Sequence, residues 1–203
     1  MKTMHSQLDT SSSGGYNQPS IQAPLSYAES IAGVKLPWYA VYVRAQREKV
    51  VSDLLAQRGY ESLVPTYRVL RRWSDRKVEM EVPLFPGYVF TRMEIERRLP
   101  VLTTPGVVYI VGLGKVPVAL PESEIAAVQA VVASRCNAEP HAFLKTGQTL
   151  RLRTGPLAGV EGILIKIKAG YRLVLSIDLL QRSIAAEVDL ADVEGPIDRM
   201  KLT

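Results

Sequence analysis

The 203-residue chain has few of the residues that form covalent or metal crosslinks, with one cysteine and two histidines. Cys136 has no second cysteine for an internal disulfide, and nothing in the cysteine usage indicates an oxidising compartment. His5 and His141 lie far apart in the sequence, so the chain cannot assemble a metal site of the zinc-finger kind.

An uninterrupted apolar run of membrane-spanning length is also missing. The most apolar region, residues 99–120, is broken by prolines, glycines and a lysine, and it cannot cross a bilayer as one helix. Residues 1–17 lack the apolar core of a secretory signal. The sequence therefore predicts a soluble, cytoplasmic protein.

Arrangements typical of enzymes are absent from the sequence as well. No glycine-rich phosphate loop follows a predicted strand and opens a helix, and no Ser-His-Asp, Cys-His or paired-carboxylate arrangement emerges. The 25 Lys and Arg residues exceed the 20 Asp and Glu residues, which gives a net charge of +5. This excess suits work beside a polyanion but does not identify nucleic acid as the ligand.

The first half of the chain predicts a mixed fold of strands and helices. Residues 1–36 read as a flexible tail that we expect to be disordered. We expect strands over residues 38–44, 60–64, 66–72, 77–82, 88–93 and 107–111, and helices over 47–58, over 95–103 and from Pro121 onward. Because hairpins interrupt the alternation, the pattern favours an α+β sandwich, with helices on an antiparallel sheet, over residues 37–136.

The sequence pattern of the second half predicts a small β-barrel. Residues 137–143 are a short connection that spans at most roughly 25 Å, so the two halves should stay close. From Leu144 the sequence turns to short strands of period two, over 149–154, 161–168, 171–177 and 183–188. We therefore expect a barrel over residues 144–196, followed by a tail over 197–203.

Two stretches of the first half are candidates for contact with a partner. The tip of the hairpin over residues 66–82 carries four basic residues, which form either a solvated turn or a set of phosphate contacts. The run Leu84–Phe90 has a bend at Pro86-Gly87 and strand-forming residues after it, so it reads as a bent buried strand. A phenylalanine beside such a bend can also be an exposed anchor, which leaves both interpretations open.

Landmarks in both halves resemble the NusG family of transcription elongation factors. In the first half they are Trp38-Tyr39, Val64-Pro65-Thr66, Phe85-Pro86-Gly87-Tyr88-Val89, and Pro105-Gly106-Val107 with Gly112. In the second half, Gly147 and the sequence over residues 154–162 resemble the KOW motif. The resemblance covers about residues 37–195, and it implies an N-terminal NusG (NGN) domain and a C-terminal KOW domain with an SH3-like barrel.

This resemblance implies a factor without catalytic chemistry or a cofactor. In the family the NGN domain binds the clamp helices of the largest RNA polymerase subunit and bridges the DNA cleft to suppress pausing, while the KOW domain recruits other factors. The expected polymerase-binding residues are Trp38, Tyr39, Phe85, Pro86, Gly87, Tyr88 and Phe90. The expected contacts to the exposed DNA strand are Arg71, Arg72, Arg76 and Lys77. The expected KOW partner loops contain Gly155, Pro156, Leu157, Gly159, Val160, Gly162, Leu179, Leu180 and Arg182.

The barrel loops depart from the housekeeping NusG pattern. Housekeeping NusG has phenylalanines where this chain has Leu157 and Val160, and an Ile-Phe-Gly-Arg loop where it has residues 177–182. Those loops are where NusG meets the termination factor Rho and the ribosomal protein that doubles as NusE. The changes speak against Rho binding and leave a NusE-type contact open. The sequence over residues 176–183 resembles RfaH-related paralogues, above all the UpxY-type antiterminators of long polysaccharide operons.

Several interpretations of function remain at this point. We favour a monomeric, operon-specific antitermination paralogue, and the housekeeping elongation factor is the alternative. A third interpretation makes the barrel an RNA-binding module like those of ribosomal proteins, which would use Arg151, Arg153, Lys166 and Lys168. Residues 179–193 also tolerate a helix, so the barrel could refold as that of RfaH does.

Overall fold

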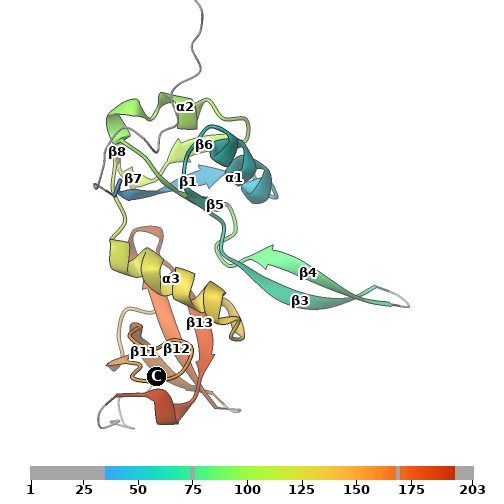
Figure 1. Ribbon diagram of the computed structural model, residues 1–203, viewed down its shortest axis with the longest axis vertical. Helices are drawn as coiled ribbons and strands as arrows, with labels where there is room; N and C mark the ends of the chain where they lie inside the picture. The colour runs from blue at the N-terminus through green and yellow to red at the C-terminus, as the bar shows by residue number, and fades with distance from the viewer. Residues whose placement is uncertain (1–34, 74–75, 168–169, 195–203) are drawn as a thin grey trace, which may run out of the picture.

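The computed structural model describes residues 35–73, 76–167 and 170–194 (Figure 1). The predicted tails lie outside these ranges, apart from Lys35 and Leu36. Within the described ranges, no helix has both the length and the apolar character needed to cross a membrane.

A four-stranded antiparallel sheet forms the centre of the first half. Its strand order is β2 (Ser62–Leu63), β5 (Tyr88–Arg92), β1 (Trp38–Val43) and β6 (Val107–Ile110). Because side chains alternate along a strand, Trp38 and Ala40 join the apolar cluster on one face, and Tyr39 and Val41 join the cluster on the other. The predicted strand over 60–64 shortens to β2, because Tyr60 donates its backbone N–H to the Leu55 carbonyl of the preceding helix (3.0 Å) instead of to a strand.

Three helical segments cover the sheet face that carries Tyr39. They are α1 (Glu48–Gln57), the 3-10 helix η1 (Ile95–Arg97) and α2 (Leu99–Leu102). Val51, Leu55 and Val101 are their buried contacts with that face. The single helix predicted over 95–103 is divided into η1 and α2, because Pro100 cannot donate the hydrogen bond that would continue one helix.

Two hairpins extend from this sandwich. β3 (Thr66–Trp73) and β4 (Arg76–Pro83) form a long hairpin that projects away from the rest of the molecule in Figure 1. β7 (Gly112–Leu113) and β8 (Val116–Pro117) form a short hairpin that the sequence did not predict as strands. It requires glycine at position 112, where a Cβ atom would collide with the backbone carbonyl of Val116.

Helix α3 (Glu122–Ser134) lies between the sheet and the second half of the chain (Figure 1). Ile125, Val128 and Val131 form its buried stripe, while Val132 is only half-buried. The helix is apolar on more than one side, as expected for a helix with protein on both sides. One apolar cluster therefore runs from the sheet face of Trp38 through α3 into the barrel.

The second half is the predicted small barrel, with a five-stranded antiparallel sheet. Its strand order is β10 (Thr149–Arg151), β11 (Glu161–Ile167), β12 (Gly170–Ile177), β13 (Arg182–Val188) and β9 (Ala138–His141). The 3-10 helices η2 (Asp178–Leu180) and η3 (Leu190–Asp192) complete it. Residues 179–193 thus form a strand and turns in this structure.

The connection over residues 137–143 is not merely a linker. Ala138–His141 forms β9, which pairs with the open edge of β13 from Ala138 opposite Ala186 to His141 opposite Ser183. The edge strand β13 gains backbone hydrogen bonds from this added strand. Four residues are too few for a period-two pattern to predict a strand here. Only residues 135–137 separate α3 from the barrel sheet.

Candidate interaction surface

The bend at Pro86-Gly87 is held in place from two sides. The backbone N–H of Gly87 donates to Glu48 Oε1 at the start of α1 (2.8 Å), and Val43 N–H donates to the Gly87 carbonyl (2.9 Å). Gly87 has a φ of +85°, and a Cβ atom there would lie 3.2 Å from the ring of Tyr42. The bend thus needs a glycine both for its backbone conformation and for the close approach of this ring.

Beyond the bend, the predicted dock residues divide between two faces of the sheet. Trp38, Phe85, Tyr88 and Phe90 lie on the α3 side, where Phe85 and Phe90 meet edge to face at 5.5 Å. Tyr39 lies on the opposite side, under α1 and α2, and does not share their surface. Phe85, the expected contact beside the bend, is 1% exposed in this conformation. Pro86 is exposed and Gly87 half-buried.

Three tyrosines cross the sheet on the α3 side, and we call them the tyrosine row: Tyr88 on β5, Tyr42 on β1 and Tyr109 on β6. Tyr42 is the direct cross-strand partner of both other tyrosines. Its ring meets that of Tyr88 edge to face at 5.5 Å and stacks on that of Tyr109 at 5.0 Å. Tyr109 is 48% exposed, so the row runs from the half-buried bend to open surface.

Sequence reasoning missed Tyr42 and Tyr109 as members of this site. Period-two spacing does place Tyr42 on the face of Trp38. The pairing of β1 with both β5 and β6 is a long-range feature, however, and a single sequence does not state which strands become neighbours.

The barrel reaches the sandwich at two points near this surface. The pKa of the Tyr88 hydroxyl is raised, mainly by burial and further by the neighbouring Tyr109. The charge of Arg182 and its hydrogen bond to Tyr88 act in the opposite direction and lower this pKa. Arg182, the first residue of β13, therefore lies against Tyr88, the member of the tyrosine row that is next to the bend. On α3, the carboxylate of Glu124 accepts a hydrogen bond from the backbone of Asp178 in η2.

The predicted KOW partner loops supply few free apolar side chains. Leu157, Val160 and Leu180 are 3%, 7% and 7% exposed and belong to the shared apolar cluster, while Leu179 is half-buried. Pro156, Gly155, Gly159 and Arg182 are exposed, and Gly162 is half-buried. The loops thus present backbone and one arginine, with their leucines turned into the core.

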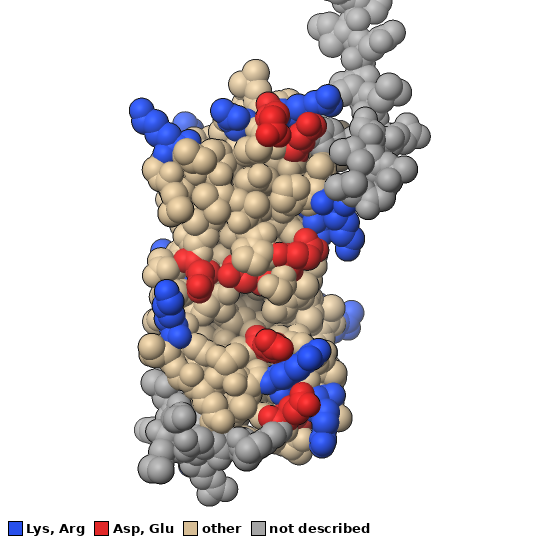
Figure 2. Space-filling model, turned by 90° about the vertical axis from the view of Figure 1, so that its left-hand side faces the viewer, with Lys and Arg blue, Asp and Glu red and all other residues tan. Residues whose placement is uncertain are grey.

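The basic tip of the β3–β4 hairpin is open to solvent. Arg72 and Lys77 are direct cross-strand partners, as are Trp73 and Arg76, and the side chains of Arg72, Arg76 and Lys77 are exposed. The side chain of Arg71 lies outside the described part of the structure. Figure 2 views the side of the molecule away from this hairpin, and acidic side chains form a band across its middle there. Basic side chains on that side do not merge into a continuous patch.

The fold and this surface define a two-domain protein in which an α/β sandwich shares one helix with a small β-barrel. Residues 36–129 match the protein-family model described as "Transcription termination factor nusG". Over these residues the chain is similar to the NusG family of transcription termination and antitermination factors.

Relatives match both halves of the chain. The transcription termination/antitermination protein NusG of Helicobacter pylori J99 is 26% identical over 172 residues, which covers 78% of this chain and 98% of that protein. The Pseudomonas aeruginosa protein of the same name is 29% identical over 171 residues, covering 77% and 97%. A solved structure titled "Domain interaction in Thermotoga maritima NusG" is 22% identical, covers 79% of this chain and 97% of that chain, and has a TM-score of 0.49.

Proposed function

We propose that this protein is an elongation and antitermination factor that binds RNA polymerase through its NGN domain, with the tyrosine row as the main contact. The observation that carries the proposal is a row of three aromatic rings on a rigid sheet, with the outermost, Tyr109, half-exposed. Tyrosines are enriched among residues that dominate binding energy, because they bury a large area at a small entropic cost. Clamp helices of the largest polymerase subunit are the partner that the family suggests.

The burial of each predicted contact residue decides whether its substitution can test polymerase binding without unfolding the domain. Phe85 fills the core beside Phe90, so Phe85→Ala should destabilise the fold by about 3–5 kcal/mol and would confuse loss of fold with loss of binding. Tyr109 has about half of its side chain in water, so its removal should leave the sandwich folded. Tyr88 tests the other end of the row, where polymerase would have to displace Arg182 of the barrel.

The experiment is retention of the full-length protein on immobilised RNA polymerase. Tyr109→Ala and Tyr88→Ala should each weaken retention roughly tenfold or more, as expected for central aromatic contacts. Tyr171→Ala is the matched control, because Tyr171 is a half-buried tyrosine on β12 of the barrel. Wild-type retention of both Tyr88→Ala and Tyr109→Ala in folded protein would contradict a dock at the tyrosine row.

The proposal includes a restricted set of targets, namely long operons of the polysaccharide type. It is supported by barrel loops that bury Leu157 and Val160, where the housekeeping pattern has phenylalanines. A housekeeping role is the alternative, and full-length matches to NusG proteins favour it. Transcription in vitro decides between them: a specialised factor should increase read-through only on templates that carry its operon leader. Equal read-through on unrelated templates would support the housekeeping role.

A further inference from the structure

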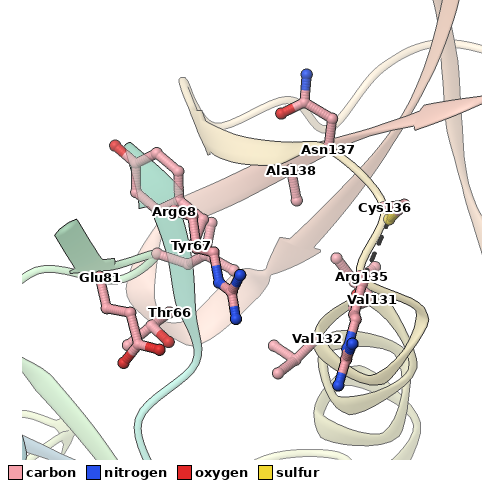
Figure 3. Close-up of a pocket in the computed structure, with 11 residues that line it drawn as sticks. Thr66, Tyr67, Arg68, Glu81, Val131, Val132, Arg135, Cys136, Asn137 and Ala138 are labelled. Atoms are coloured by element: carbon pink, nitrogen blue, oxygen red, sulfur yellow. Dashed lines mark hydrogen bonds between the residues drawn. The ribbon is translucent and has the colours of Figure 1, made fainter. Parts of the chain in front are cut away.

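A cleft of about 400 Å³ lies where the β3–β4 hairpin meets the end of α3 and the start of β9. Its apolar wall is formed by Leu84, Val131 and Val132. Its polar lining comes from both sides, with Arg68 on β3 and Arg135 just after α3 (Figure 3). The cleft therefore has two guanidinium groups above an apolar wall.

Arg135 occupies a backbone conformation that rarely suits a side chain. It caps α3 in the left-handed region, with φ 54° and ψ 19°. Glycine usually fills this position, and another residue there costs roughly 1 kcal/mol. Among the described residues, the Arg135 side chain has no hydrogen-bond or ion-pair partner. Fold stability thus does not explain the arginine, and backbone strain of this kind is often found at functional sites.

Arg68 reaches the same cleft from the hairpin. Figure 3 shows its side chain extending from β3 toward the α3 side of the cleft, away from Glu81. Its ion pair with Glu79 is long, at 3.5 Å, and two-thirds of the side chain is exposed. Glu81 also lines the cleft, but its carboxylate lies 3.9 Å from Lys49 Nζ, which offsets its charge.

One face of the hairpin leads from the cleft to the basic tip. Cross-strand pairs alternate between faces, so the pair of Arg68 with Glu81 shares a face with the pair of Arg72 with Lys77. The pair of Leu70 with Glu79 lies between them on this face, and the two outer pairs are about 13 Å apart. The basic side chains therefore lie at the two ends of this stretch, at the cleft and at the tip, and a short single strand of nucleic acid can contact both ends.

We propose that this cleft binds a phosphate group of single-stranded nucleic acid, held between the guanidinium groups of Arg68 and Arg135. The planar guanidinium pairs with phosphate oxygens through two parallel hydrogen bonds, and neutralising a phosphate releases counterions. This site rests on the proposed function, in which the hairpin faces nucleic acid during transcription. A segment of acidic protein is the competing occupant, and the exposed basic tip of the same hairpin, with Arg72, Arg76 and Lys77, favours nucleic acid over it.

The test measures binding of a fluorescent 12-nucleotide single strand, as DNA and as RNA, to the full-length protein without polymerase. Arg135→Gly should weaken binding roughly tenfold at low salt and reduce the slope of log affinity against log salt by about 0.7. The same change relaxes the left-handed backbone, so the melting temperature should stay equal or rise. Arg68→Gln should weaken binding to a similar degree without this gain in stability.

Two control variants separate the charge from the backbone. Gln181 is an exposed residue with φ 51°, so Gln181→Gly relaxes a left-handed position in the barrel and should leave binding unchanged. Arg98→Ala removes an exposed arginine near α2 and should also bind as wild type. Loss of binding in Gln181→Gly or Arg98→Ala equal to that in Arg135→Gly would overturn the site.

Unchanged oligonucleotide affinity in both Arg135→Gly and Arg68→Gln would overturn the proposal outright. If the same two variants bind the oligonucleotide normally but lose retention on polymerase, the cleft holds an acidic protein segment and the proposal is wrong. Failure of the tyrosine-row variants to affect polymerase retention would count against the proposed dock alone, because the oligonucleotide assay contains no polymerase.

Discussion

Glu122 and Glu124 stand two residues apart in the first turn of α3, and their carboxyl groups have pKa values shifted in opposite directions. A hydrogen bond from Arg92 lowers the pKa of Glu122, although burial opposes it. Burial raises the pKa of Glu124, and the charge of Asp178 adds to this effect while a backbone hydrogen bond from Asp178 opposes it. Glu124 Oε2 is buried and has no hydrogen-bond partner among the described residues.

This difference predicts a pH-dependent contact between sandwich and barrel. A raised pKa means that Glu124 supports the contact when protonated, and this support is lost as pH rises through the raised value. The contact should therefore tighten on acidification. Glu124→Gln, which stays neutral, should hold it tight at neutral pH and remove most of the dependence. A fluorophore pair on the two domains, followed by energy transfer across a pH titration, measures this.

Glu122→Gln is the matched control for that titration. The lowered pKa of Glu122 gives the opposite sign, with stability lost as pH falls through the lowered value, and its partner Arg92 lies in the sandwich. Glu122→Gln should thus keep the acid-induced tightening. A Glu124→Gln protein that titrates like wild type would show that another group controls the contact.

Arg92 is expected to be the most important charged residue for stability of the sandwich. Its side chain is 8% exposed, lies over the ring of Trp38 with Cζ 4.5 Å from the centroid, and donates to the Leu36 carbonyl at 2.6 Å. Arg92→Met should lower the free energy of unfolding by about 1–3 kcal/mol. The loss stays below that of a fully buried pair, because Glu61 and Glu122 keep access to water.

Urea denaturation measures the effect of Arg92→Met. Arg97→Ala is the comparison, since Arg97 pairs with Glu94 at the surface and should change stability by less than about 0.5 kcal/mol. Equal losses in the two variants would mean that the contacts of Arg92 with Trp38 and Leu36 contribute little.

Local patterns were enough to predict most elements of the fold. Side chains alternate along a strand, which is enough to place Tyr88 and Phe90 on one face and Val89 on the other, as the structure has them. Glycine and proline signals placed the bend at Pro86-Gly87, the end of α1 and the start of α3. These features depend on neighbours a few residues away, which is the range over which a single sequence is informative.

Features that depend on distant neighbours could not be predicted in the same way. The apolar sides of α3 indicate burial, but they do not say that one side meets a sheet and another a barrel. Pairing of β9 with β13 depends on an open strand edge 42 to 48 residues downstream, since His141 pairs with Ser183 and Ala138 with Ala186. The burial of Phe85 likewise follows from how the two halves pack, so its local sequence could not decide between a buried ring and an exposed anchor.

The glycines of the KOW motif should differ in what they tolerate. A Cβ at Gly162 would lie 2.7 Å from the Val174 carbonyl oxygen, which β12 cannot move without shifting its ladder. Gly162→Ala should therefore cost about 3 kcal/mol. Gly159 has φ +86°, and a Cβ there would meet only the end of the Arg151 side chain at an ordinary 3.9 Å, so Gly159→Ala should cost about 1 kcal/mol. Thermal denaturation compares them, and a larger loss in Gly159→Ala would reverse the argument.

Because one apolar cluster joins sandwich and barrel, the two should unfold together. Leu164 is a fully buried residue of β11 in this cluster, and Leu164→Ala should cost about 2–5 kcal/mol. Both tryptophans, Trp38 and Trp73, lie in the first half of the chain, so their fluorescence reports unfolding of that half. The temperature of their melting transition should fall by roughly 5–15 °C even though the substitution is in the barrel.

Lys166→Ala, an exposed change on the same strand, is the control and should leave the temperature of the tryptophan transition unchanged. An unchanged tryptophan transition in Leu164→Ala, with a separate earlier loss of strand signal by circular dichroism, would mean that the domains unfold independently.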